Sequence, residues 1–253
     1  MSLFDLSGTI AIVTGGNRGI GFAIAEGLAK HGARVVIANR HEEGGRTAVA
    51  NLEAQGLAAE AVPTDVSDSQ AVSSLVQEVL QRHGHIDILV NNAAVILRKP
   101  AEEVTEEEWD RLMSVNLRGA FICCREVGRH MIERRKGKII NVSSNVSQVV
   151  QPLRSVYSVA KAGLSHLTRA LALEWAPYGI NVNAIGPGAT ITDINRQYFE
   201  EHPDDFKARV DQVPMGRIGM PADSVGAAIF LASAASDYMT GQTLIVDGGT
   251  NLP

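Results

Sequence analysis

Short apolar runs rich in β-branched residues alternate along this chain with longer segments of helical period. This alternation is typical of a parallel sheet covered by helices on both faces. The expected strands are Thr9–Val13, Arg34–Ala38, Ala59–Pro63, Ile86–Val90, Lys138–Val142, Asn181–Ile185 and Thr243–Val246. The expected helices lie near Gly19–His31, Glu42–Gln55, Ser69–His83, Glu106–Arg135, Ser155–Pro177 and Pro221–Ala235. The sequence therefore predicts a doubly wound α/β fold with a seven-stranded parallel sheet.

No linker, charge block or internal repeat divides the chain, so we expect a single domain over residues 1–253. The stretch 188–214 differs from the rest because it is long, polar and weakly patterned. Segments of this kind are often lids or binding loops, and a disordered or plain surface insertion is the alternative. We expect a substrate loop or lid here.

Composition and charge argue against several classes of function. A net charge of −5 does not favour a nucleic-acid partner. The first residues do not resemble a signal peptide, and no apolar run reaches the length of about 18 residues that a membrane span needs. Cys123 and Cys124 are adjacent and lack partners at metal-ligand spacing, which favours reduced core thiols over a disulfide or a zinc site. We expect a cytoplasmic enzyme with no membrane span and no metal.

A glycine-rich turn follows the first expected strand, in Thr14-Gly-Gly-Asn-Arg-Gly-Ile-Gly21. Glycines let a backbone turn sharply and approach a pyrophosphate, whose charge is met by the N-terminus of the following helix. The spacing of Gly15, Gly19 and Gly21 differs from G-x-G-x-x-G. Its place at the first strand-to-helix turn is nevertheless the context that a dinucleotide site requires. The sequence predicts a dinucleotide-binding domain of Rossmann type.

The end of the second strand should decide between the two nicotinamide cofactors. A carboxylate there would bind the ribose 2′-hydroxyl, whereas an arginine accommodates a 2′-phosphate. This chain has Asn39 and Arg40 at that point, and Arg18 in the glycine loop. We predict a preference for NADP(H), with NAD(H) possible.

Tyr157 and Lys161 are four residues apart in an expected helix, so they share one of its faces. A free phenol has a pKa of about 10, and a nearby cation favours the phenolate. Ser144 ends an apolar strand thirteen residues before Tyr157, where its hydroxyl could hydrogen-bond a substrate oxygen. The three residues form a candidate proton-transfer site.

Together these residues resemble the short-chain dehydrogenase/reductase family, in its branch of about 250 residues, essentially end to end. The motifs that carry the resemblance are Thr14-Gly-x-x-x-Gly-x-Gly21, Asp65-Val66, Asn91-Asn-Ala-Ala94, Asn116, Ser144, Tyr157, Lys161 and Pro187-Gly188. The resemblance implies hydride transfer between a nicotinamide and a substrate carbon, without a metal.

The resemblance also implies a role for each matching position. Tyr157 would transfer the proton, Ser144 would orient the carbonyl and Asn116 would anchor a water relay that reaches Lys161. Lys161 would also hold the nicotinamide ribose and lower the pKa of the phenol. Further cofactor contacts are implied or expected at Gly15, Asn17, Arg18, Gly19, Ile20, Gly21, Asn39, Arg40, Asp65, Val66, Asn91, Ala93, Pro187, Gly188, Ile191 and Thr192.

Within the family, residues 95–100 and 214–219 are similar to those of enzymes that act on sugars, polyols and keto sugar acids, such as gluconate 5-dehydrogenases. Arg98, Lys99 and Arg154 could place cationic donors near the mouth of the site, and Arg98 and Arg154 are the candidate substrate-binding residues. The alternatives are a 3-oxoacyl carrier-protein reductase, a broad ketone reductase, or a dinucleotide-sensing protein without turnover.

Family members of this size are commonly homotetramers in which the two long central helices pair between subunits. Apolar side chains on those helices are compatible with pairing or with packing on the sheet: Ala120, Phe121, Cys124, Leu164, Leu167 and Leu171. The resemblance therefore implies a homotetramer.

Overall fold

The computed structural model describes residues 2–192 and 195–252, and in it seven parallel strands form one sheet in the order β3-β2-β1-β4-β5-β6-β7. The strands are β1 (Ile10–Thr14), β2 (Arg34–Asn39), β3 (Ala59–Pro63), β4 (Ile88–Asn91), β5 (Gly137–Val142), β6 (Ile180–Pro187) and β7 (Thr243–Val246). The α-helices are α1 (Gly19–Lys30), α2 (Glu42–Glu53), α3 (Ser69–His83), α4 (Glu106–Met113), α5 (Ala120–Arg134), α6 (Ser155–Trp175), α7 (Arg196–Glu201), α8 (Pro203–Asp211) and α9 (Val225–Ala232). The predicted α/β fold class is confirmed.

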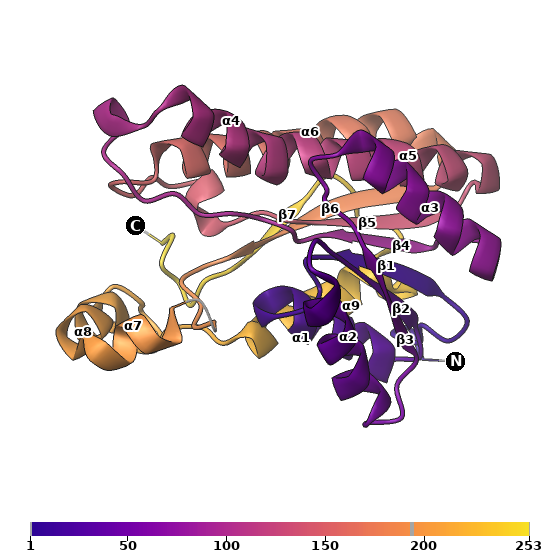
Figure 1. Cartoon of the computed structure of the whole chain (residues 1–253), viewed down its shortest axis with the longest axis horizontal. Coiled ribbons are helices and arrows are strands. Elements are labelled where there is room, and N and C mark those ends of the chain that lie inside the picture. Colours follow the sequence, from indigo (N-terminus) through magenta and orange to yellow (C-terminus); the bar gives the residue numbers. More distant parts are fainter. Residues whose placement is uncertain (1, 193–194, 253) are drawn as a thin grey trace.

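Helices cover both faces of the sheet. Helices α3, α4, α5 and α6 lie on one face, and α1, α2 and α9 lie on the other (Figure 1). Alternate residues of a strand point to opposite faces, so Ile10 and Ile12 of β1 join one apolar cluster while Ala11 and Val13 join the other. The sheet is therefore buried on both sides, as its continuous apolar strands predict.

The expected helix over 106–135 is one helical run with an irregular centre. It begins at a capping box in which Thr105 and Glu108 exchange hydrogen bonds, and α4 and α5 are joined by a π-helical segment at Ser114–Gly119. Such a segment adds a residue to a helical turn and frequently marks a functional site. Asn116 lies in this segment.

The strand order reverses between β1 and β4, and this reversal fixes where a ligand can enter. In an open parallel sheet, ligands bind beyond the carboxyl ends of the strands at such a switch point. The register aligns Thr14 of β1 with Asn91 of β4, and Asn91 with Asn141 of β5. The glycine loop, the segment after Asn91 and Ser144 therefore open at one edge of the sheet.

The polar stretch 188–214 is more regular than the sequence suggests. It contains α7 and α8, which fold against each other through a hydrogen bond from Tyr198 to Asp205 and an edge-to-face contact of Phe199 with Phe206 at 5.7 Å. These helices stand apart from the sheet at the edge where the sites open (Figure 1). Their periodicity is hard to recognise because they span only 6 and 9 residues. Residues 193–194 of the expected lid lie outside the described residues.

Across the described residues, no helix is both long and apolar enough to cross a membrane.

Candidate active site

The glycine loop leaves β1 and exposes the start of α1. Gly15 donates its N–H to the carbonyl of Ala38 at 2.7 Å and has a φ of +62°, which favours glycine. Helix α1 begins at Gly19 after Arg18, whose side chain makes no capping hydrogen bond. The free N–H groups of the first turn and the positive end of the helix dipole suit an anionic pyrophosphate.

Asn92 holds the glycine loop in shape, a role that the sequence analysis missed. Its Nδ2 donates to the carbonyls of Thr14 at 3.1 Å and Gly15 at 3.0 Å. A Cβ on Gly21 would lie 2.3 Å from the same Nδ2, so only glycine fits there. The available signal was the second asparagine of Asn91-Asn-Ala-Ala94, because β4 lies directly beside β1.

The side chains of Asn39 and Arg40 lie differently at the end of β2. Asn39 is buried, and its amide donates to the carbonyl of His41 at 2.6 Å, so it braces the start of α2. Arg40 is exposed, with its guanidinium 3.2 Å from the His41 ring. Hydrogen bonds from Ser67 hold the pKa of Asp65 below its usual range, and the Arg40 charge contributes. Arg40 and Asp65 therefore lie at one end of the crevice.

Asn91 points into the core, so any contact it makes with a cofactor must come from its backbone. Its Nδ2 donates to Asn141 Oδ1 at 2.9 Å, and Asn141 in turn donates to Thr168 Oγ1 at 2.9 Å. All three side chains are buried. The network ties β4, β5 and α6 together beneath the candidate site.

The segment after β6 runs back to the glycine loop. A Cβ on Gly19 would lie 3.4 Å from Cγ2 of Thr192. The Ile191 N–H donates to the carbonyl of Gly219 at 2.9 Å, so this donor is already used within the protein. Gly188 follows β6, where Asp247 leaves no room for a Cβ. The predicted cofactor residues around Thr192 thus face those of the glycine loop.

The remaining predicted cofactor residues lie along the same edge of the sheet, beyond the carboxyl ends of the strands. Asn17 sits beside the start of α2, since a Cβ on Gly44 would lie 2.9 Å from its Nδ2. Val66 is buried. Ile20 belongs to the first turn of α1, Ala93 contacts Gly15 across the loop, and Pro187 ends β6.

Ser144, Tyr157 and Lys161 meet where β5 ends and α6 begins. The Ser144 hydroxyl lies 3.4 Å from the carbonyl oxygen of Pro187. Lys161 is buried and donates to the carbonyl of Val142 at 2.7 Å, and its Nζ lies 5.7 Å from the centre of the Tyr157 ring. Strand β5 and helix α6 therefore place a hydroxyl, a phenol and an ammonium together.

The electrostatics of this group differ from the sequence expectation. Burial raises the pKa of Tyr157, while the Arg154 charge and the Ser144 hydroxyl act to lower it. Burial also lowers the pKa of Lys161 to about 8. The expected lowering of the phenol pKa by Lys161 is not found, because removal of both groups from water favours their neutral forms.

Asn116 uses both ends of its side chain to hold the loop after β4. Its Oδ1 accepts from the N–H of Val95 and its Nδ2 donates to the carbonyl of the same residue, both at 2.8 Å. The side chain is buried. The geometry thus gives Asn116 a direct part in fixing the loop that leads to Arg98.

Arg98 and Arg154, the candidate substrate cations, lie near this group. Arg154 immediately precedes α6, and burial together with the charges of Arg98 and Arg209 lowers its pKa to about 10. Its charge also acts on Tyr157. Arg98 is exposed on the loop after β4.

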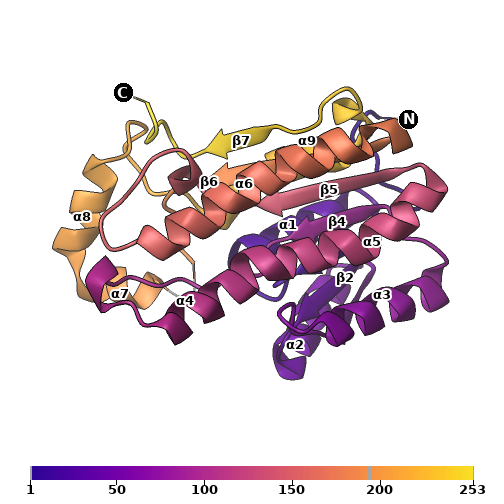
Figure 2. The ribbon, with the colours of Figure 1, turned by 90° about the horizontal axis from the view of Figure 1, so that it is seen from above.

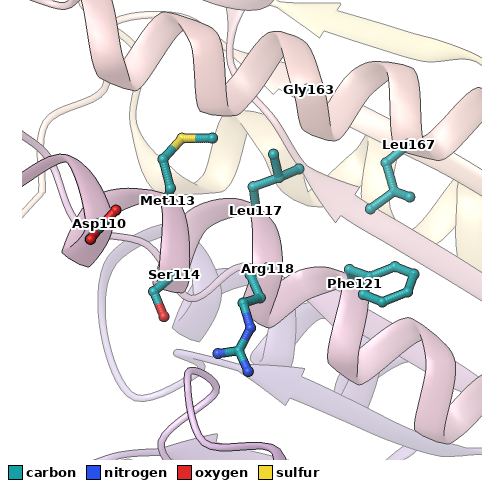
Figure 3. A pocket seen from close by; sticks show the side chains of 8 residues that line it. All are labelled: Asp110, Met113, Ser114, Leu117, Arg118, Phe121, Gly163 and Leu167. Atoms are coloured by element: carbon teal, nitrogen blue, oxygen red, sulfur yellow. The ribbon is translucent and has the colours of Figure 1, made fainter.

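A cavity of about 670 Å³ lies away from this edge, between the α4–α5 run and α6. Figure 2 shows the two helical runs side by side, and Figure 3 shows Phe121 and Leu167 projecting into the space between them. Of the six apolar residues that were compatible with subunit pairing, Ala120, Cys124, Leu164 and Leu171 are buried in the protein itself. Phe121 and Leu167 remain available to a partner.

Comparison with known proteins decides the family. The profile described as Enoyl-(Acyl carrier protein) reductase matches residues 15–251. A gluconate 5-dehydrogenase of Gluconobacter oxydans is 41% identical over 98% of this chain and 96% of its own length, and a 3beta-hydroxysteroid dehydrogenase 1 of Eggerthella lenta is 42% identical over 98% and 95%. The chain belongs to the short-chain dehydrogenase/reductase family.

A solved structure extends the comparison to three dimensions. The gluconate 5-dehydrogenase of Burkholderia cenocepacia, in complex with NADP and tartrate, is 41% identical, with a TM-score of 0.93 over 99% of this chain and 98% of its own. Members of the short-chain dehydrogenase/reductase family are NAD(P)-dependent oxidoreductases of CH–OH and C=O groups. The enzymatic prediction is therefore confirmed, and the alternative of a sensor without turnover loses its support.

Proposed function

We propose that this enzyme transfers a hydride between NADP(H) and the carbonyl or alcohol carbon of a keto sugar acid, in the manner of a gluconate 5-dehydrogenase. The observation that carries the proposal is the placement of Tyr157 beside the half-buried cation Arg154 at the edge where the glycine loop opens. A proton carrier next to an arginine suits a carbonyl compound that also bears a negative charge. Two of the three relatives described above are gluconate 5-dehydrogenases, which supports the same substrate class, whereas the third is a steroid dehydrogenase.

In the proposed mechanism, Ser144 donates a hydrogen bond to the substrate carbonyl oxygen and Tyr157 donates the proton to it. When bound, the nicotinamide supplies the hydride in reduction and accepts it in oxidation. Lys161 holds the nicotinamide ribose and returns a proton toward the phenol. Because burial brings the pKa of Lys161 to about 8, the amine can release and take up a proton near neutral pH.

The proposed relay cannot use the side-chain amide of Asn116, because its Oδ1 and Nδ2 both form hydrogen bonds with the backbone of Val95. A π-helical turn changes which carbonyls are bonded along a helix. We therefore assign the relay to the backbone carbonyl of Asn116, with water carrying the proton between it and Lys161.

The proposed preference for NADP(H) rests on Arg18 and Arg40. Both are exposed at the crevice, and within residues 2–192 and 195–252 neither forms an ion pair with a carboxylate. Two unpaired guanidinium groups suit a 2′-phosphate. The uncapped start of α1 fits the pyrophosphate of either cofactor.

A substrate panel tests the proposed function. Purified enzyme should be assayed with 5-ketogluconate, a ketose, a 3-oxoacyl thioester, a 3-ketosteroid and a simple ketone, each with NADPH and with NADH. We expect the highest kcat/KM for 5-ketogluconate with NADPH. Faster turnover of the thioester or the steroid would overturn the sugar-acid assignment, and faster turnover with NADH would overturn the cofactor assignment.

We further propose a cytoplasmic homotetramer. Phe121 and Leu167 line the cavity between the α4–α5 run and α6, and Phe121 is 42% exposed. Apolar groups of this size at a helix pair favour burial against a second copy of the same helices. The two buried, unpaired cysteines fit a reducing compartment.

A further inference from the structure

Three arginines from three separate segments converge at the mouth of the site. Arg98 lies on the loop after β4, Arg154 precedes α6, and Arg209 lies on α8. The charges of Arg98 and Arg209 both act on Arg154, and that of Arg98 acts on Arg209. Arg154 and Arg209 are half-buried, so these like charges are gathered in a place where water screens them poorly.

Within residues 2–192 and 195–252, none of these three arginines forms an ion pair with a carboxylate. The polar contacts of Arg209 are with neutral amides: Nη2 donates to Gln151 Oε1 at 3.3 Å and Nη1 to Gln212 Oε1 at 2.9 Å. The neighbouring cation Lys99, by contrast, does have a countercharge, since its Nζ lies 3.0 Å from a carboxylate oxygen of Glu108. Gathering unpaired cations costs free energy that a bound anion can offset.

The cluster is built around the proton carrier. Arg154 is the residue that immediately precedes α6, and its charge acts on the Tyr157 phenol in the first turn of that helix. The N–H of Lys99 donates to the carbonyl of Leu153 at 3.0 Å, which fastens the Arg98 loop to the segment before α6. The hydrogen bond from Arg209 to Gln151 holds α8 against the same segment before α6.

We propose that Arg209 joins Arg98 and Arg154 in binding the carboxylate of the substrate, so that α8 closes the site over an acidic substrate and not over a neutral one. This inference rests on the proposed function, since it names the part of the sugar acid that the lid recognises. A guanidinium fork matches a carboxylate with two parallel hydrogen bonds. Arg209 is thus a specificity-determining residue for the substrate carboxylate.

Calorimetric titration tests the inference without requiring turnover. D-gluconate, and D-glucitol as its uncharged counterpart, are titrated into enzyme saturated with NADPH, because an alcohol cannot pass a hydride to the reduced cofactor. The variants are Arg209→Gln, Arg209→Lys and, as a matched loss of charge on the exposed side of the same helix, Lys207→Gln.

We expect Arg209→Gln to weaken gluconate binding at least about tenfold, as loss of a charge-assisted hydrogen bond predicts. Glucitol binding should not change, Arg209→Lys should recover part of the affinity, and Lys207→Gln should behave as the parent enzyme. Equal affinity of the parent enzyme for the two ligands would overturn the inference, as would equal effects of Arg209→Gln on both. Gluconate binding that depends on Arg209 without turnover of 5-ketogluconate would instead refute the proposed function alone.

Discussion

The ammonium of Lys161 lies 5.7 Å from the centre of the Tyr157 ring and is anchored on the carbonyl of Val142, so a buried amine stands beside a partly buried phenol. Burial raises the pKa of the phenol and lowers that of the amine. Burial therefore favours the neutral phenol, the form that can donate a proton to a carbonyl.

Removal of the phenol oxygen should abolish most turnover. We expect Tyr157→Phe to lower kcat by about 100- to 10,000-fold, the range for loss of a general acid. Cofactor affinity, measured by the fluorescence of bound NADPH, should fall little. Tyr238→Phe is the matched control because Tyr238 is fully exposed. Near-normal activity of Tyr157→Phe would refute the proposed role.

The depressed pKa of Lys161 predicts a pH dependence of stability. The pKa is about 8 in the folded protein and 10.5 ordinarily. Between these values the unfolded chain binds more protons than the folded one, so stability rises with pH. Below pH 8 the free energy of unfolding carries the full penalty for burying the ammonium, and this penalty decreases as the pH rises above 8. In urea unfolding from about pH 7.5 to 9.5, the parent enzyme should gain stability relative to Lys161→Met; a difference that does not change with pH would contradict this.

Arg40 should set the choice of cofactor. We expect Arg40→Gln to lower kcat/KM for NADPH by about tenfold or more, as the loss of a charge-assisted hydrogen bond of about 1.5–3 kcal/mol implies, and to leave NADH nearly unaffected. Arg46→Gln removes an exposed charge from the neighbouring helix α2 and is the control. A parallel loss with both cofactors would argue against contact with the 2′-phosphate.

Gly21 should not accept even a methyl group. We expect Gly21→Ala to destabilise the protein by about 1–3 kcal/mol, as overpacking does, and to weaken cofactor binding, because the new Cβ would displace Asn92 from the glycine loop. Gly226→Ala is a sharp control, since its Cβ would meet nothing within 4 Å and alanine favours a helix. Thermal unfolding of both variants, with NADPH titrations, checks the pair; equal melting temperatures would refute the steric argument.

Phe121 should hold subunits together. A glutamate in its place would bury a charge in the proposed interface, so Phe121→Glu should dissociate the oligomer. Light scattering at several protein concentrations measures the mass, and Leu3→Glu, at a residue 64% exposed elsewhere, is the control. A monomeric parent enzyme would remove the proposal.

The fold was predictable because short apolar runs rich in β-branched residues alternate along the chain with longer segments of helical period. All seven expected strands are present, and Ala59–Pro63 and Thr243–Val246 have the expected bounds. The glycine loop and the Tyr157–Lys161 spacing are local patterns, so the sequence alone could expose them. Partners that depend on tertiary contact could not be found that way: Asn92 reaches the glycine loop across 77 residues, and Arg209 reaches Gln151 across 58.

The side chain of Thr192 lies beside Gly19 of the glycine loop, close to where an added Cβ would point. The same stretch of chain continues into α7 and then α8, which carries Arg209. In the proposed function, nucleotide and substrate selection would therefore share this one stretch of chain. A change that refits the segment to a different nucleotide would also displace the proposed lid, so we expect evolution or engineering of this enzyme to alter the two specificities together.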